Sequence, residues 1–350
     1  MSTFWKHVIL IHFTLLTNFE TEKKQQTMKK IIFGVFSLFT LFAQAQKVDY
    51  SVVSVPEESG NQFVQITTAS DYVCMPIVKR SSGRIDWLSN RILDTSVDGF
   101  HIAYLSARNN TTNIFIKEVD KQGSSVQRTN RSAVLDFSYS PDGKYICFSE
   151  TRGKENQIFQ TSATEGYVCR QVTSGNQDYS PIYSANMKQI FFSRMEAKST
   201  SIWSYDIEKN FLSTHSNGMN PCPLADGTAF LCARINASGR CEIWRINNTT
   251  GSEECIISDP NRSFTTPTIS PDGRWIVFVG ESRLTNGNLV YLNTDIFAAK
   301  IDGTNLVQLT YHAADDLSPV WSKNGKYIYF ISQRGSADGT ANIWRMNFNY

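Results

Sequence analysis

The stretch that decides the fold reads Ser140-Pro141-Asp142-Gly143-Lys144-Tyr145-Ile146-Cys147-Phe148-Ser149. Asp-Gly is a tight-turn dipeptide, because glycine adopts positive φ without a steric penalty. After the turn, residues alternate between apolar and polar with a period of two, which is the pattern of a half-buried β-strand. The stretch therefore predicts a tight turn that leads into an antiparallel strand.

This unit recurs along the chain. Two strong copies begin at Ser270 and Ser322, and weaker copies contain Asp98-Gly99, Asn186-Met187 and Asp226-Gly227. A second motif, an isoleucine followed by an aromatic residue, comes after every copy of the turn. Its six examples are Ile114-Phe115, Ile158-Phe159, Ile202-Trp203, Ile243-Trp244, Ile296-Phe297 and Ile343-Trp344. Two independent motifs thus give the same count, and 40 to 53 residues separate one copy from the next.

A repeat of this length with four short strands is a blade of a β-propeller. The sequence predicts an all-β protein, a six-bladed propeller of four-stranded antiparallel blades. The expected blades are residues 90–130, 131–175, 178–218, 219–258, 264–312 and 315–350. A bulky residue follows the turn glycine by five positions in most copies and is expected to pack between neighbouring sheets. These positions hold Tyr104, Phe148, Phe192, Cys232, Phe278 and Phe330.

The last copy stops after its third strand, at Tyr350, and lacks an outer strand like residues 305–310 of the preceding copy. Residues 62–68 supply a matching piece near the other end of the chain. We expect this N-terminal strand to complete the C-terminal blade, because closing the ring removes an exposed sheet edge.

The N-terminal region reads as a secretory leader. Lys29 and Lys30 precede the apolar run 31–42, and Ala43-Gln44-Ala45 is a small-residue cleavage site. The run is shorter than the roughly 20 residues of a membrane span. We therefore expect cleavage after Ala45, a periplasmic or secreted protein, and no transmembrane segment in the mature chain. Residues 28–45 are the signal peptide, residues 46–350 are one propeller domain, and residues 1–27 read as a misassigned start or a leader extension.

Composition narrows the class of partner. The whole chain is 41% hydrophobic with a formal net charge of +2, and removing residues 1–45 takes away five Lys and two Glu, which leaves −1. A chain so close to neutral has no general attraction for nucleic acid or anionic lipid. The seven cysteines are an odd number, so at least one stays free, and Cys232 and Cys241 are weak candidates for a disulfide across a turn.

The Ser-Pro-Asp-Gly turns, the Ile-aromatic strands and the Gln-Leu-Thr outer strands resemble the TolB-type branch of the WD-like propeller repeats. The resemblance covers residues 62–350, and only residues 46–61 precede the first expected strand. The α/β domain that precedes the propeller in TolB has no counterpart in so short a segment. The resemblance implies an envelope protein that binds other macromolecules. We expect the partner to be a protein or a glycan-associated macromolecule, and the protein itself to be a monomer.

Two insertions in the repeat, residues 70–89 and 280–294, are expected to form long loops on one face of the propeller. Loops of this length are usually functional or disordered. The first insertion combines charge with an aromatic residue, as interfaces do, in Lys79, Arg80, Arg84 and Trp87. The alternative is a solvated loop that only covers the end of the propeller.

One arginine follows the second strand of each copy. The six are Arg108, Arg152, Arg194, Arg234, Arg283 and Arg334. They would form a partner-binding rim for anions or carboxylates, since guanidinium binds these groups bidentately. The favoured alternative is that each arginine ties its loop to a neighbouring carbonyl or to an aspartate such as Asp178 or Asp316, because repeated residues usually serve the repeat.

Asp178, Asp316, His215 and His312 are the candidates for the mouth of the central channel, because each histidine follows a predicted fourth strand. TolB-like propellers are similar to some metal-dependent pectic-oligosaccharide lyases that use a cluster of histidines. The scattered histidines of this chain do not match a metal-ligand pattern, and no G-x-S-x-G, H-E-x-x-H or Walker motif occurs. We expect no catalytic residue, cofactor or metal, and thus a binding or scaffold propeller. A carbohydrate-binding, small-ligand or lyase-like propeller that uses the channel is the alternative.

Overall fold

The computed structural model describes residues 50–350 except 77, 82–83, 89–90, 122, 166–167, 198 and 287–288. The side chains of residues 77–90 and 283–291 are also outside the description. Residues Tyr50–Tyr350 form one compact unit, and the expected leader lies outside the described residues.

The described chain consists of β-strands and two single-turn 3₁₀ helices, η1 (Pro56–Glu58) and η2 (Ala69–Asp71). Strands that follow one another in sequence pair in antiparallel fashion into sheets. The first sheet contains β4 (Leu93–Thr95), β5 (His101–Arg108), β6 (Thr111–Glu118) and β7 (Val126–Gln127). The next strands are β8 (Val134–Tyr139), β9 (Tyr145–Arg152), β10 (Glu155–Ser162), β11 (Cys169–Gln171), β12 (Gln177–Tyr183), β13 (Gln189–Met195), β14 (Thr200–Asp206) and β15 (Phe211–Asn217). A single parallel pair, Asn156 with Gln177, joins the four strands β8–β11 to the four strands β12–β15.

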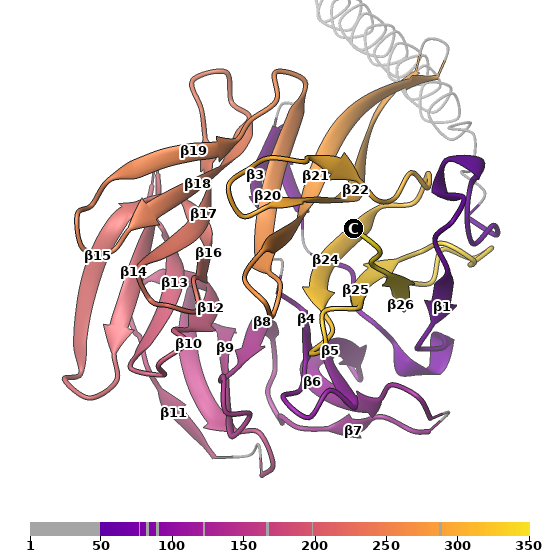
Figure 1. Cartoon of the computed structure of the whole chain (residues 1–350). Helices are drawn as coiled ribbons and strands as arrows, with labels where there is room; N and C mark the ends of the chain where they lie inside the picture. Colours follow the sequence, from indigo (N-terminus) through magenta and orange to yellow (C-terminus); the bar gives the residue numbers. More distant parts are fainter. Residues whose placement is uncertain are drawn as a thin grey trace, which may run out of the picture. The chain divides into compact units, whose positions relative to one another are not determined.

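The sheets follow one another around the molecule in chain order (Figure 1). Two further four-stranded sheets contain β16 (Met219–Pro223), β17 (Ala229–Ile235), β18 (Cys241–Asn247) and β19 (Glu253–Ile257), then β20 (Arg262–Ile269), β21 (Trp275–Asn286), β22 (Leu289–Lys300) and β23 (Val307–Gln308). The last sheet holds β24 (Asp316–Trp321), β25 (Tyr327–Ser332) and β26 (Asn342–Asn347). The all-β architecture of four-stranded antiparallel sheets is that of a β-propeller.

The strand β1 (Phe63–Gln65) is the fourth strand of this last sheet. It pairs in antiparallel fashion with β26, and Phe63 lies opposite Met346. The pairing continues past β1, where the Ile66 N–H donates to the Ile343 carbonyl at 2.8 Å. Figure 1 shows β1 and β26 side by side. Segments from the two ends of the described chain therefore share one sheet.

The Ser-Pro-Asp-Gly turn is held by its own side chains. The Ser140 hydroxyl donates to Asp142 at 2.6 Å and accepts the Tyr145 N–H at 2.9 Å. Gly143 has a φ of 72°, a conformation that suits glycine. The serine makes the same two contacts at Ser270 and Ser322. The motif recurs because each of its residues has a role in the turn that starts a strand.

The bulky residues predicted between sheets are in the core. All six positions have no solvent exposure: Tyr104, Phe148, Phe192, Cys232, Phe278 and Phe330. Burial of side chains of this size contributes roughly 1.5–3 kcal/mol each to folding. The prediction that they pack inside is confirmed.

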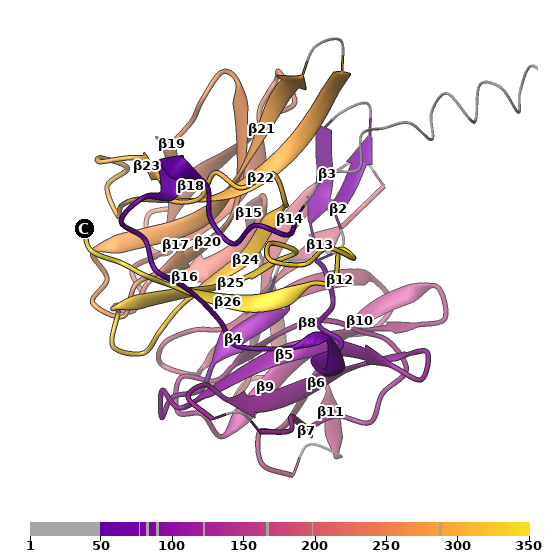
Figure 2. The ribbon, with the colours of Figure 1, turned by 90° about the vertical axis from the view of Figure 1, so that its right-hand side faces the viewer.

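The two insertions are β-hairpins, which differs from the expected irregular loops. Residues 70–89 contain η2 and a hairpin of β2 (Val78–Ser81) and β3 (Arg84–Leu88). Residues 280–294 extend β21 and β22, which stay paired as far as Asn286 and Leu289. Both hairpins project from the same end of the molecule (Figures 1 and 2). Continued pairing satisfies the backbone polar groups that an irregular loop would expose.

The seven cysteines are all in the described part of the chain, and none of them forms a disulfide. Cys232 lies opposite Trp244, and Cys241 lies opposite Ile235, so the two are not cross-strand neighbours. The disulfide considered between them is therefore absent.

Candidate functional site

The repeated arginines stack on aromatic rings. Five of the six have described side chains, and each guanidinium carbon lies 4.1–5.1 Å from the centre of a ring in its own sheet. The pairs are Arg108 with Phe115, Arg152 with Phe159, Arg194 with Trp203, Arg234 with Trp244 and Arg334 with Phe330. In the first four pairs the ring comes from the Ile-aromatic motif, so the two repeated features contact each other as cation–π pairs.

Four of these arginines also bind a carboxylate. Arg194 donates to Asp178 through Nε at 2.7 Å and Nη2 at 3.0 Å, and both residues are buried. Arg234 makes a two-pronged pair with Glu253 at 2.6 and 2.7 Å. Arg152 donates to Glu150 at 3.1 Å. The interpretation that these arginines tie the repeat together is confirmed for them, including the predicted partner Asp178.

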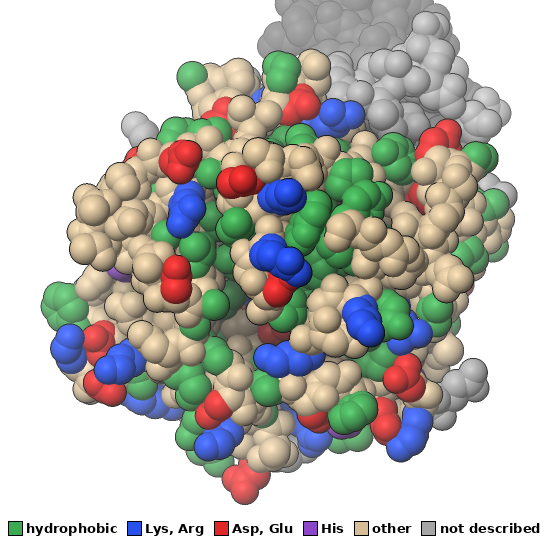
Figure 3. Space-filling model, viewed as in Figure 1, with side chains coloured by type: hydrophobic (Ala, Val, Ile, Leu, Met, Phe, Trp, Pro, Cys, Tyr) green, Lys and Arg blue, Asp and Glu red, His purple; other side chains and the backbone are tan. Residues whose placement is uncertain are grey.

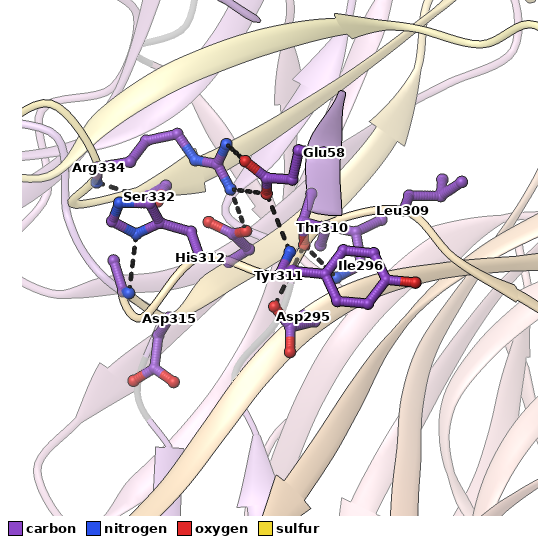
Figure 4. Close-up of polar contacts among 12 residues, drawn as sticks. Glu58, Asp295, Ile296, Leu309, Thr310, Tyr311, His312, Asp315, Ser332 and Arg334 are labelled. Carbon is purple, nitrogen blue, oxygen red and sulfur yellow. Dashed lines mark hydrogen bonds and ion pairs between the residues drawn. The ribbon is translucent and has the colours of Figure 1, made fainter. Parts of the chain in front are cut away.

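Arg334 is the centre of a buried polar cluster (Figure 4). Its Nη2 donates to Asp316 at 2.6 Å and to Glu58 at 3.0 Å, while Nη1 donates to Glu58 at 3.2 Å and to the Val53 carbonyl at 3.1 Å. All three ionic side chains have no solvent exposure. The arginine therefore joins the segment before β1 to the start of β24, and Asp316 is the partner that the sequence predicted.

Asp295 lies next to this cluster, on β22. Its carboxylate accepts hydrogen bonds from Asn293 at 3.1 Å and Gln308 at 3.2 Å. Burial, together with the nearby Asp316 and Glu58 carboxylates, raises the pKa of Asp295 to about 9. Asp295 is therefore mainly protonated at neutral pH and is able to donate as well as accept a hydrogen bond.

His312 borders the same cluster. Its Nδ1 accepts the Ala314 N–H at 2.9 Å, so its Nε2 carries the proton and donates to the Val52 carbonyl at 3.1 Å. Burial and the Arg334 charge lower the pKa of His312. The imidazole is held neutral with both nitrogens occupied, so it has no lone pair free for a metal.

His215 is not at the channel mouth, and that prediction is wrong. The strand β15 continues to Asn217, so His215 lies on the outermost strand of its sheet. Its ring packs against Phe191 and Phe230, and its Nε2 is 2.8 Å from the Ser204 hydroxyl. Across the described residues, no group of three His, Cys, Asp or Glu side chains is arranged to hold a metal ion.

A pocket of about 560 Å³ opens beside Asp295, at the base of the β21–β22 hairpin. Polar side chains line most of it, among them Arg262, Asn293, Gln308 and Tyr311. Its volume lies in the range of small-ligand pockets. The sequence pointed to neither Glu58 nor Asp295. Glu58 lies outside the repeats, and Asp295 fills the position before Ile296, where the polar residue varies from one repeat to the next.

A different pocket, of about 420 Å³, lies at the turns before β21 and β25, at the other end of these strands. The rings of Trp275, Trp321 and Phe348 meet there edge to face. In Figure 3, hydrophobic side chains gather near the C-terminus with lysine and arginine side chains around them. Two copies of the repeated turn, which begin at Ser270 and Ser322, line this pocket, but the sequence predicted only a structural role for them.

Lys79, Arg80, Arg84, Trp87 and Arg283 were also candidates for partner contact. Their backbone lies in the two projecting hairpins, with Lys79 opposite Trp87 and Arg283 opposite Leu292. Their side chains lie outside the described residues. Among the helices that the structure describes, none is long and apolar enough to cross a membrane.

No protein-family model matches the sequence, and no curated protein matches it either. Solved structures do match. A protein from Agrobacterium tumefaciens described as a TolB is 19% identical, with a TM-score of 0.55 over 76% of this chain and 94% of that one. TolB from Acinetobacter baumannii is 18% identical, with a TM-score of 0.56 over 71% of this chain, and the match spans 64% of that longer protein.

An enzyme shares the architecture too. An oligogalacturonate lyase from Vibrio parahaemolyticus is 10% identical, with a TM-score of 0.56 over 86% of this chain and 96% of the lyase. Identities this low relate the proteins by fold and leave their activities separate. The repeated turns, the stacked arginines and these neighbours agree on one conclusion: the chain has a TolB-like β-propeller fold.

Proposed function

We propose that this protein is a non-enzymatic binding propeller of the cell envelope, exported with a leader that is cleaved after Ala45. In this proposal six blades form a ring, which β1 closes by completing the last sheet. A protein or a glycan-associated macromolecule binds the end that carries the β2–β3 and β21–β22 hairpins. Lys79, Arg80, Arg84, Trp87 and Arg283 make the contact.

The projection of both hairpins from one end carries the proposal (Figures 1 and 2). Among the described residues, 283–286 on β21 pair only with 289–292 on β22, because the contact of β21 with β20 ends at Ser282 and β22 meets β23 only at Ala298 and Phe297. A hairpin that its own sheet does not require is available for a partner. The TolB-like fold supports a role in the envelope, as the resemblance implies.

The test is capture of partners from envelope extract with the mature protein. A variant with serine at Lys79, Arg80, Arg84 and Trp87 and a variant with a shortened β21–β22 hairpin are compared with wild type. The matched control is a variant with serine in place of Arg274 and Lys323, which lie on the turns before β21 and β25, away from the two hairpins. We expect both hairpin variants to lose partners that wild type and control retain. Retention of the same partners by all four proteins would contradict the proposal.

Export is tested separately by N-terminal sequencing of the protein from the periplasm or the medium. The expected first residue is Gln46. A mature chain that starts well before Gln46, or a protein found only in the cytoplasm, would contradict this part of the proposal.

A second function, binding or cleavage of an acidic oligosaccharide, is favoured by one observation. The pocket beside Asp295 combines a protonated carboxyl group, an arginine and three amides, which suits a polar ligand. The test is an oligogalacturonate lyase assay with and without added divalent metal. Unsaturated product formed by wild type and lost in Asp295→Asn would favour the enzyme, and no product under either condition would favour the binding propeller.

A further inference from the structure

Arg108 departs from the other arginines at its repeat position. Arg152, Arg194, Arg234 and Arg334 each bind a carboxylate, but Arg108 has no carboxylate within ion-pair distance among the described residues. Its partners are neutral oxygens: Nε donates to Ser106 at 3.0 Å, and Nη2 donates to Ser125 at 2.9 Å and to the Asp71 carbonyl at 3.2 Å. Within the described part of the chain, Nη1 has no hydrogen-bond partner.

The charges around Arg108 leave a local excess of one positive charge. The neighbouring cation, Lys117, is paired with the Asp71 carboxylate at 3.1 Å and also donates to the Gly123 carbonyl. That carboxylate also accepts the Tyr104 hydroxyl and the Thr68 N–H. Burial raises the pKa of Asp71, but its hydrogen bonds and Lys117 outweigh burial, so the carboxyl stays ionised for Lys117. Asp71 thus neutralises the lysine and not the arginine.

The guanidinium of Arg108 is held in place before any ligand arrives. It lies 4.1 Å from the ring centre of Phe115 and 5.5 Å from that of Tyr72. Three hydrogen bonds fix its Nε and Nη2 edges. A fixed arginine loses little conformational entropy on binding, and its Nη1 is left to donate to a carboxylate oxygen.

A pocket of about 750 Å³ lies at this arginine, between β1 and the first sheet. Figure 2 shows the segment after β1 lying beside β5, where Asp71 accepts a hydrogen bond from Ser106. Hydroxyl and amide side chains line the pocket with Arg108, among them Gln65, Thr68, Ser70 and Ser124. The volume is that of a small-ligand site, and the lining suits a ligand that carries hydroxyl or amide groups.

We propose that Arg108 anchors a binding site for a carboxylate, carried by a small polar ligand, in this pocket. The carboxylate accepts from Nη1 and supplies the negative charge that Asp178, Glu253 or Glu150 provides at the other arginines. The site does not rest on the proposed function, because it involves neither projecting hairpin.

The experiment measures binding by calorimetry with the mature protein and three probes. Glucuronate carries the carboxylate on a hydroxylated ring, glucose has the ring without it, and N-acetylaspartate carries the group as a peptide would. We expect saturable binding of glucuronate or N-acetylaspartate, at least about tenfold tighter than glucose, since a charged hydrogen bond is lost with glucose. The tighter of the two acids identifies the source of the carboxylate. Equal binding of glucose, or no saturable binding of either acid, would overturn the proposal.

Variants at two arginines distinguish a loss of ligand binding at Arg108 from the general effect of losing an arginine at this repeat position. Arg108→Gln is expected to weaken acid binding about tenfold or more, and Arg108→Lys to weaken it less. Arg152→Gln is the matched control, because Arg152 has the same repeat position and the same aromatic contact but pairs with Glu150. Equal losses in Arg152→Gln and Arg108→Gln would contradict the proposal.

A measurement on the wild-type protein covers the case in which Arg108→Gln does not fold. Phenylglyoxal modifies accessible arginines, and mass spectrometry reports the modified positions. We expect the bound acid to protect Arg108 at least several-fold while Arg152 is modified at an unchanged rate. Modification of Arg108 at the same rate with and without the acid would refute the site.

Discussion

At the scale of single residues, Arg334 shows how an arginine of the repeat becomes part of the core. A buried guanidinium loses its hydration, and two carboxylates at 2.6 and 3.0 Å compensate for that loss. Removing the guanidinium would leave Glu58 and Asp316 buried without their cation. Breaking a buried pair in this way is far more costly than breaking an exposed one.

We expect Arg334→Ala to lower the free energy of unfolding by about 3–5 kcal/mol. Arg152→Ala, at an arginine whose side chain is 48% exposed, should lower it by less than about 1 kcal/mol. Urea unfolding followed by circular dichroism measures both. Equal losses in the two variants would show that the buried cluster contributes no special stability.

Asp295 makes stability depend on pH. Its pKa is about 9 in the folded protein against an ordinary value of 3.8, so the folded state keeps a proton that the unfolded chain releases. This contribution to stability is complete below pH 4 and is lost as the pH rises toward 9, by about 1.4 kcal/mol for each unit. Between pH 6 and 8.5, Asp295→Asn should show a much shallower decline than wild type in urea titrations. An exposed control, Asp302→Asn, should keep the wild-type slope.

The sequence predicted those residues of the site that belong to the repeat. Asp178 and Asp316 each stand three residues before a proline, and an arginine follows in the next strand, so their pairing was readable. Glu58 was missed because it lies in the segment before β1, outside the repeats. Asp295 was missed because the polar residue before the Ile-aromatic pair varies from one repeat to the next. The sequence also could not predict that Arg108 differs from the other repeated arginines, because only the structure shows that its hydrogen-bond partners are uncharged.

At the scale of elements, the β21–β22 hairpin is longer than its sheet requires. Among the described residues, those after Ser282 on β21 and before Asn293 on β22 pair with each other, but not with the flanking strands β20 and β23. The sequence carried a signal for this hairpin, the dipeptide Asn286-Gly287, which favours a two-residue turn. The segment was expected to be a loop because it makes this copy of the repeat longer than the others.

We expect replacement of residues 284–291 by a two-residue Asn-Gly turn to leave the melting temperature within about 3 °C of wild type, which corresponds to less than about 1 kcal/mol. The ladder between β20 and β21 stays intact in this variant. Differential scanning calorimetry measures the change. A loss of ten degrees or more would mean that the hairpin tip stabilises the fold through contacts other than its own pairing.

At the scale of the whole molecule, β1 contributes to stability through the last sheet. Without it, β26 would present a row of unpaired backbone groups, which is a template for aggregation. The same segment provides Glu58 to Arg334 and the Asn61 amide to the Leu309 carbonyl. The segment therefore covers both a sheet edge and a buried charge.

Deletion of residues 46–69 is expected to give a protein that aggregates, measured by size-exclusion chromatography and light scattering. Deletion of residues 46–49 alone, which keeps β1 and Glu58, is the control and should remain soluble. A soluble 46–69 deletion that unfolds cooperatively would refute a closing role for β1.

The pairing of β1 with β26 also sets the order of events during synthesis. Gln62 and Asn347 are hydrogen-bonded but lie 285 positions apart in the chain, so the ribosome completes the first partner long before it starts the second. Contacts between such distant positions form slowly, because the intervening chain loses much entropy when its ends meet. A nascent chain therefore cannot complete this sheet until β26 has left the ribosome.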